Sequence, residues 1–128
     1  MSGDLSTPGA DAILNSFGAG TLYVKLHLGD PGTNGTSNAA AETDRIPVNA
    51  WTAAGAAGAG YRGISNTEVE EILNAAATEN VTHVSFWSAS SGGTCHFVAA
   101  LAGTLNVTAA DTIQIPIGAL VIKFPVWT

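Results

Sequence analysis

The chain has 128 residues, and four Lys and Arg against ten Asp and Glu give a formal net charge of −6. An acidic surface repels phosphate backbones and anionic lipid, so this balance disfavours direct binding to nucleic acid or to a membrane. Hydrophobic residues make up 46% of the chain and charged residues only 11%, which excludes the disordered class. The length suits one domain, residues 1–128, and the low charge suggests that other subunits cover part of its surface.

The first twenty residues predict an arm and a short helix. Ser6 offers a hydroxyl for the N-cap, and Pro8 stands in the first turn, where its missing N–H costs little. Gly18 or Gly20 ends the helix. The apolar stripe of this helix consists of Ala12, Ile13 and Phe17. We expect the helix to plug one end of a β-sandwich formed by residues 21–128.

The segment 22–45 reads as a strand followed by a long polar loop. Apolar side chains alternate from Leu22 to Leu28, which is the period of a half-buried strand. Proline and glycine at 30–35 then impose turn chemistry. The spacing is a near miss to a calcium loop, because Ala41 stands where a bidentate Glu is needed. The loop is therefore interpreted as a contact loop without a metal.

Residues 45–77 contain weaker signals. Residues 45–51 predict a second strand, and Pro47 favours an edge position because proline cannot donate to the ladder. Residues 53–60 are rich in Ala and Gly and indicate a flexible connection, and residues 61–65 can pair briefly. Residues 67–77 fit both a helix, with a capping box at 65–68, and a short strand around Val69–Leu73.

The remainder of the chain predicts antiparallel strands. Residues 82–87 and 96–101 alternate on either side of the hairpin loop Ser88–Gly93. Shorter alternating runs follow at 105–107, 113–117 and 120–124. Strands at this spacing with turns between them indicate an all-β, mainly antiparallel fold, a β-sandwich or barrel.

No residue pattern indicates catalysis or a cofactor. Cys95 is the only cysteine and is interpreted as a small buried thiol on a strand. The carboxylates at 68, 70 and 71 fit a solvated face better than a catalytic pair. The three histidines are interpreted as rim or interface side chains, namely His27, His83 and His96. The chain is therefore not expected to be an enzyme or to bind a metal.

Three pieces of the sequence carry a family resemblance. They are residues 22–32 ending in Gly-Asp-Pro-Gly, Val81-Thr82-His83-Val84 followed by Ser90–Gly93, and the run Ile115–Ile122. Over nearly the full chain, the sequence resembles a family of small structural proteins of tailed bacteriophages, regarded as head decoration or tail-associated proteins. The resemblance implies a compact, mostly antiparallel β-fold without enzymatic activity, used in many copies on a virion surface. The expected fold class is therefore a β-sandwich or jelly-roll-like domain with a short N-terminal helix. The resemblance also favours the strand at Val69–Leu73.

The leading hypothesis is a head decoration protein that folds in the host cytoplasm and stabilises the outer capsid lattice. Its partner would be the major capsid protein of the same virion, and it would form a homo-oligomer such as a trimer. The expected contact residues are Tyr23, Asp30, Pro31, Asn34, Asn38, Val126 and Trp127. The first alternative is a tail- or fibre-associated virion protein that contacts the host. The second alternative is a carbohydrate-binding β-sandwich module, with Trp87 or Tyr61 stacked on sugar rings.

Overall fold

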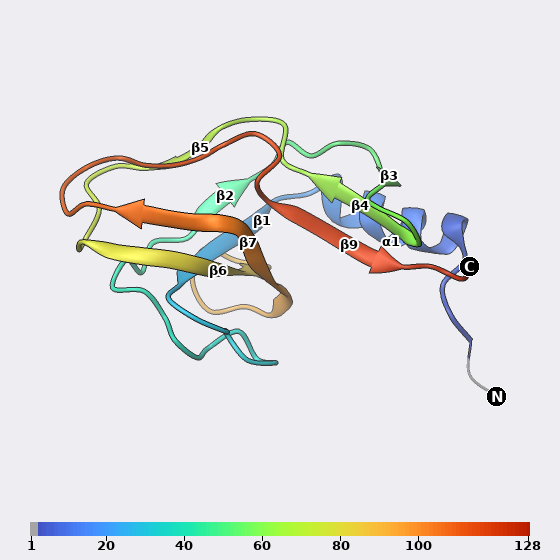
Figure 1. Ribbon diagram of the computed structural model, residues 1–128, viewed down its shortest axis with the longest axis horizontal. Helices are drawn as coiled ribbons and strands as arrows, with labels where there is room; N and C mark the ends of the chain where they lie inside the picture. Colours follow the sequence, from blue (N-terminus) through green and yellow to red (C-terminus); the bar gives the residue numbers. More distant parts are fainter. Residues whose placement is uncertain (1–2) are drawn as a thin grey trace.

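The computed structural model describes residues 3–128 as antiparallel sheets with one helix, α1 (Thr7–Gly18) (Figure 1). The largest sheet has the order β2-β1-β6-β7, in which the central strands are β1 (Leu22–His27) and β6 (Glu79–Trp87). Its outer strands are β2 (Ile46–Val48) and β7 (Cys95–Val107). The sequence prediction of an all-β, mainly antiparallel sandwich is therefore confirmed.

Two smaller sheets complete the fold. The first has the order β3-β4-β9, from β3 (Gly55–Ala56), β4 (Tyr61–Ser65) and β9 (Val121–Pro125). The second pairs β5 (Glu70–Ile72) with β8 (Ile113–Ile115). The strand prediction for Val69–Leu73 is thus confirmed over its central three residues. Figure 1 shows β4 and β9 beside α1 at one end of the molecule, and β6 and β7 at the other.

All three sheets and the helix share one hydrophobic cluster. Its buried members include Leu14 of α1, Val24 of β1, Phe86 of β6, Ile115 of β8 and Ile122 of β9. Each such side chain contributes about 2 kcal/mol when it leaves water. The core therefore ties elements that are far apart in the sequence into one packed body.

The edge position of the second strand is confirmed. β2 lies at the edge of its sheet, and Pro47 is paired with Tyr23 of β1. Proline has no N–H to donate, so it is tolerated where no further strand follows.

The N-terminal helix forms as expected, and Phe17 packs against the core, but the predicted stripe is wrong at Ala12 and Ile13. The Ser6 hydroxyl caps it by accepting from the Gly9 N–H at 3.2 Å. The buried residues are Ala10 and Leu14, whereas Ala12 and Ile13 face solvent. Asp11 explains this rotation, because its carboxylate accepts two hydrogen bonds from the Arg62 guanidinium of β4, at 2.9 and 3.0 Å.

Two further predictions are corrected by the pairing of strands. The segment 53–60 is not only a connection, because β3 within it pairs with Gly63 and Arg62. The two short strands expected at 96–101 and 105–107 are one strand, β7. It stays continuous through a bulge in which residues 101–104 lie opposite the single residue Thr82, since Ala100 pairs with His83 and Leu105 with Val81.

The chain has one helix of 12 residues in its described part. Within residues 3–128, no helix has the length and apolar character needed to cross a bilayer.

The rotation of α1 gives a direct stability test. Leu14→Ala removes a fully buried side chain and should lower the free energy of unfolding by about 2–4 kcal/mol. Ile13→Ala, one residue away and 37% exposed, should change it by about 1 kcal/mol or less. Urea unfolding of both variants measures the difference, and equal losses would contradict the described helix face.

Candidate contact surface

A loop folds back over the outer face of the central strands. The Tyr23, Lys25 and His27 side chains alternate with the core-facing residues of β1, so they belong to this outer face. The Asp30–Asn38 loop leaves β1 and returns to it, because the Leu28 N–H donates to the Asn38 carbonyl at 2.8 Å. The Ala40 N–H then donates to the Leu26 carbonyl at 3.1 Å. The loop is thereby fixed to the strand at both of its ends.

Hydrogen bonds inside the loop hold its shape. The Asp30 carboxylate accepts from the Gly32 N–H at 2.8 Å, and the Asn38 side-chain amide donates to the Asp30 carbonyl at 2.9 Å. The Ser37 N–H donates to the Pro31 carbonyl at 2.9 Å. Asn38 has a φ of 52°, a left-handed conformation that asparagine tolerates better than most residues. The carboxylate thus stabilises a turn, in agreement with the interpretation of this spacing as a turn.

A buried polar network lies beneath the loop. The His27 Nδ1–H donates to the Ser37 carbonyl at 2.8 Å, which requires the proton on Nδ1 because a carbonyl only accepts. The neutral ring then accepts at Nε2 from the Ser85 hydroxyl at 2.7 Å. The Trp87 indole N–H donates to the same Ser85 oxygen at 2.7 Å. The expectation that His27 is a rim residue is therefore wrong, because the loop covers it completely.

Burial lowers the pKa of His27 below its ordinary value, and the nearby Lys25 and His83 add to this effect. The hydrogen bond to the Ser37 carbonyl opposes the shift without cancelling it. A charged ring would also disturb the chain of donors, since Nε2 would then have to donate to Ser85. The folded state consequently favours neutral His27.

The loop approaches the β6–β7 hairpin so closely that only glycine fits at one position. Gly35 has a φ of 70°, and a Cβ there would lie 2.5 Å from the Cys95 Sγ. Cys95 itself is half-buried, and burial raises the pKa of its thiol, which disfavours the nucleophilic thiolate at neutral pH. The prediction that Cys95 is a thiol on a strand is thus confirmed, since Cys95 begins β7. Its side chain is half-buried, whereas the sequence predicted a buried one.

The seven predicted contact residues fall in three separate places. Asp30, Asn34 and Asn38 are exposed on the Asp30–Asn38 loop, whereas Pro31 is buried within it. Tyr23 is half-buried near the start of β1. Val126 and Trp127 follow β9, where the Trp127 side chain is 70% exposed although its N–H donates to the Leu5 carbonyl. Their role in contacts stays a prediction.

One supporting interaction was missed from the sequence. The Arg45 guanidinium lies 4.3 Å from the centre of the Trp87 ring and donates to the Ala89 and Gly92 carbonyls. It thereby holds the Ser88–Gly93 hairpin loop against the sheet. Trp87 is nearly buried beneath it, as expected for a packed side chain, and this leaves little of its ring for a sugar.

The acidic group at 68–71 is not uniformly solvated, which corrects the expectation for Glu70. Glu70 is buried on the inner side of β5, and this burial raises the pKa of its carboxyl, with the Glu68 charge acting in the same direction. Glu68 and Glu71 remain exposed. Between residues 3 and 128, no three side chains of the metal-binding types come together as a group.

The family comparison identifies the chain as a structural protein of a tailed-phage virion. The matching family model is described as Podophage GP4 fiber I protein gp80, and the match runs over residues 10–123, from α1 into β9. The chain belongs to this family. No curated protein matches it.

This membership confirms the resemblance to small virion structural proteins of tailed phages. It does not confirm the predicted head decoration role, because the family description names a fibre protein. The fibre-associated alternative is the better supported of the two virion locations.

The buried imidazole predicts a pH dependence of stability. Because the folded state lowers the pKa of His27, only the unfolded state gains the proton near pH 6.5, so stability is full above this pH and declines as the pH falls. The decline is at most about 1.4 kcal/mol per pH unit. Urea unfolding from about pH 7.5 to about pH 5.5 measures the slope. The slope of unfolding free energy against pH should become flatter in His27→Gln and should persist in His96→Gln. Equal slopes in the two variants would contradict the role of His27 in this pH dependence.

The close approach at Gly35 predicts a second effect. Gly35→Ala and Gly92→Ala both place a side chain at positive φ, which costs about 1 kcal/mol in each case. Only the Gly35 methyl meets a neighbour, so this variant should lose an additional 1–3 kcal/mol or so. Thermal unfolding compares the two variants. Cys95→Ala in the Gly35→Ala background should recover part of the loss, and no recovery would argue against the contact.

Proposed function

We propose that this protein is a structural component of a virion fibre in a podophage-type virus. The observation that carries the proposal is the match to a fibre-protein family across residues 10–123, which includes strands β1 to β8 in full, β9 as far as Lys123, and all but the first three residues of the helix.

The Asp30–Asn38 loop is the contact element of this proposal. Its exposed side chains are short and polar, and four hydrogen bonds around its turn hold them in place before any partner arrives. A loop that is already ordered loses little conformational entropy on binding, so each contact contributes more of its energy to affinity. Such a loop suits a repeated assembly, in which modest contacts add through multiple copies.

The partners are other components of the same fibre, and the host surface is the further candidate for the loop. The major capsid protein is the binding partner expected of a head decoration protein, and a fibre component does not need to bind it. No catalytic role is assigned to any residue of the loop. The proposed function of the loop is binding to a partner.

Virion labelling tests the proposed location. Antibody-gold against this protein on intact particles should decorate fibres, with a copy number of a few per particle in a multiple set by the fibre symmetry. A decoration protein would instead label the whole head with on the order of hundreds of copies, matching the capsid lattice. Quantitative mass spectrometry of purified virions supplies the copy number, and label spread evenly over the head would refute the fibre assignment.

A further inference from the structure

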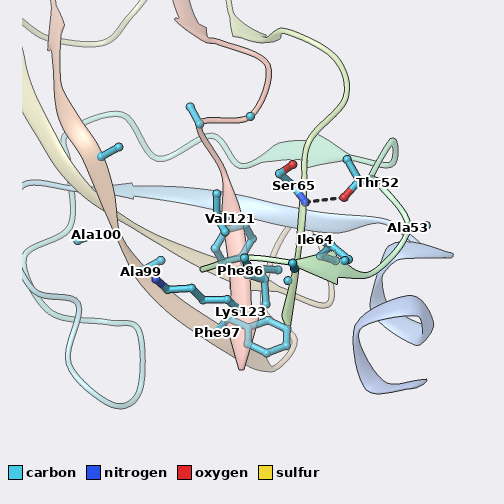
Figure 2. A pocket seen from close by; sticks show the side chains of 18 of the residues that line it. Thr52, Ala53, Ile64, Ser65, Phe86, Phe97, Ala99, Ala100, Val121 and Lys123 are labelled. Carbon is cyan, nitrogen blue, oxygen red and sulfur yellow. Dashed lines mark hydrogen bonds between the residues drawn. The ribbon is translucent and has the colours of Figure 1, made fainter. Parts of the chain in front are cut away.

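An open apolar groove lies between β7 and the sheet formed by β3, β4 and β9. It has a volume of about 940 Å³, and Figure 2 shows the side chains of Ala99 and Ala100 on one side and those of Ile64 and Ser65 on the other. Among the described residues that line it, most are Ala, Gly or larger apolar residues, and Lys123 alone carries a charge. The groove is thus open, lined mainly by small and apolar side chains, and carries a single cation.

A complementary ridge lies on the outward side of β5. Val69, Glu71 and Leu73 alternate with the buried Glu70 and Ile72, so these three side chains point away from the core. Val69 is 47% exposed and Leu73 is 68% exposed, among the most exposed large apolar side chains of the described residues. Glu71 lies between them, and its carboxylate is held by a hydrogen bond of 2.9 Å from the Gln114 side chain of β8. We call this set the β5 ridge.

The groove and the β5 ridge match each other in character. The groove carries one cation, Lys123, and the β5 ridge carries one anion, Glu71, between two exposed apolar side chains. Glu71 and Leu73 also border a hollow that contains Asp44 and Arg45, but the Arg45 guanidinium is already engaged by Trp87 and by the Ala89 and Gly92 carbonyls. The Lys123 ammonium lies only 4.6 Å from the centre of the exposed Tyr61 ring, so it stands at the surface where a carboxylate can reach it. The Arg62 guanidinium, by contrast, is already engaged by Asp11.

We propose that the groove of one copy receives the β5 ridge of a second copy, with Glu71 opposite Lys123. The inference deepens the proposed function, because a fibre brings many copies of one chain together. Leu73 and Val69 would fill the space between β7 and β9 that small side chains leave open. The acidic charge of the chain, −6 overall, repels copies elsewhere, and this contact sets an anion against a cation.

The contact joins two different surfaces, so it is heterologous. Each copy then offers a free groove and a free ridge to further copies, and the assembly closes into a ring or continues as a row. A two-fold dimer that buries one surface against itself is not expected from this arrangement.

A charge exchange tests the pairing directly. Light scattering after size exclusion should show that the wild-type chain associates at micromolar concentration. Lys123→Glu and Glu71→Lys should each weaken association at least about tenfold, because like charges then meet in the contact. The double variant Lys123→Glu with Glu71→Lys should restore it. Asp111→Lys makes the same change in net charge as Glu71→Lys, at an exposed turn, and should leave association unchanged.

Leucine substitutions test the apolar part. Leu73→Ser should weaken association, whereas Leu28→Ser, at another exposed leucine, should not. Circular dichroism and thermal unfolding confirm that each variant is folded.

Three results would overturn the inference: a wild-type chain that stays monomeric at about 100 µM, single charge variants that associate normally, or a folded double variant that fails to recover. These results are independent of the virion label. If gold labels the fibres but the purified chain stays monomeric, only the ridge contact is refuted. If the double variant restores association but gold labels the head, only the fibre assignment is refuted.

Discussion

The antiparallel pair of β1 and β6 is buried on its inner face and, at His27, Ser85 and Trp87, on part of its outer face as well, and the rest of the structure is arranged to meet that requirement. On the inner face, Leu22, Val24 and Leu26 join the common core with Val84 and Phe86. On the outer face, the Asp30–Asn38 loop covers His27 and Ser85. A strand pair in this position needs apolar packing on one side and a fully bonded polar network on the other, because buried polar groups without partners are costly. No buried side-chain nitrogen or oxygen atom of the described residues lacks a hydrogen-bond partner.

The two faces contribute in different ways. Apolar burial stabilises the inner face with little directional preference, so several packings of similar volume would serve. The chain of bonds from Trp87 through Ser85 and His27 to Ser37 is directional, and it is satisfied in one arrangement of the loop. The conformation of the loop therefore depends on side chains of β1 and β6 that never reach the surface.

Much of the fold could be predicted from the sequence, because alternation and turn residues act locally. The strands at 22–27, 61–65 and 121–125 and the edge proline of β2 all follow from such signals. The coverage of His27 could not be predicted, since a strand shows the same alternation whether water or a loop lies on its outer face. The rotation of α1 depends on Arg62, which lies far along the sequence from Asp11. The groove escaped prediction because the segment 53–60 and the small residues of β7 lack a pattern until the sheets bring them together.

The main-chain bond between Leu5 and Trp127 has a consequence for the surface of the molecule. The Trp127 N–H donates to the Leu5 carbonyl at 2.8 Å, and Val126 donates to the Gly60 carbonyl beside it, so the two end segments lie against each other. The bond between Leu5 and Trp127 joins the segment before α1 to the segment after β9, although the two lie more than a hundred residues apart in the sequence. A partner that contacts one of these segments therefore lies next to the other, on a part of the surface formed by both.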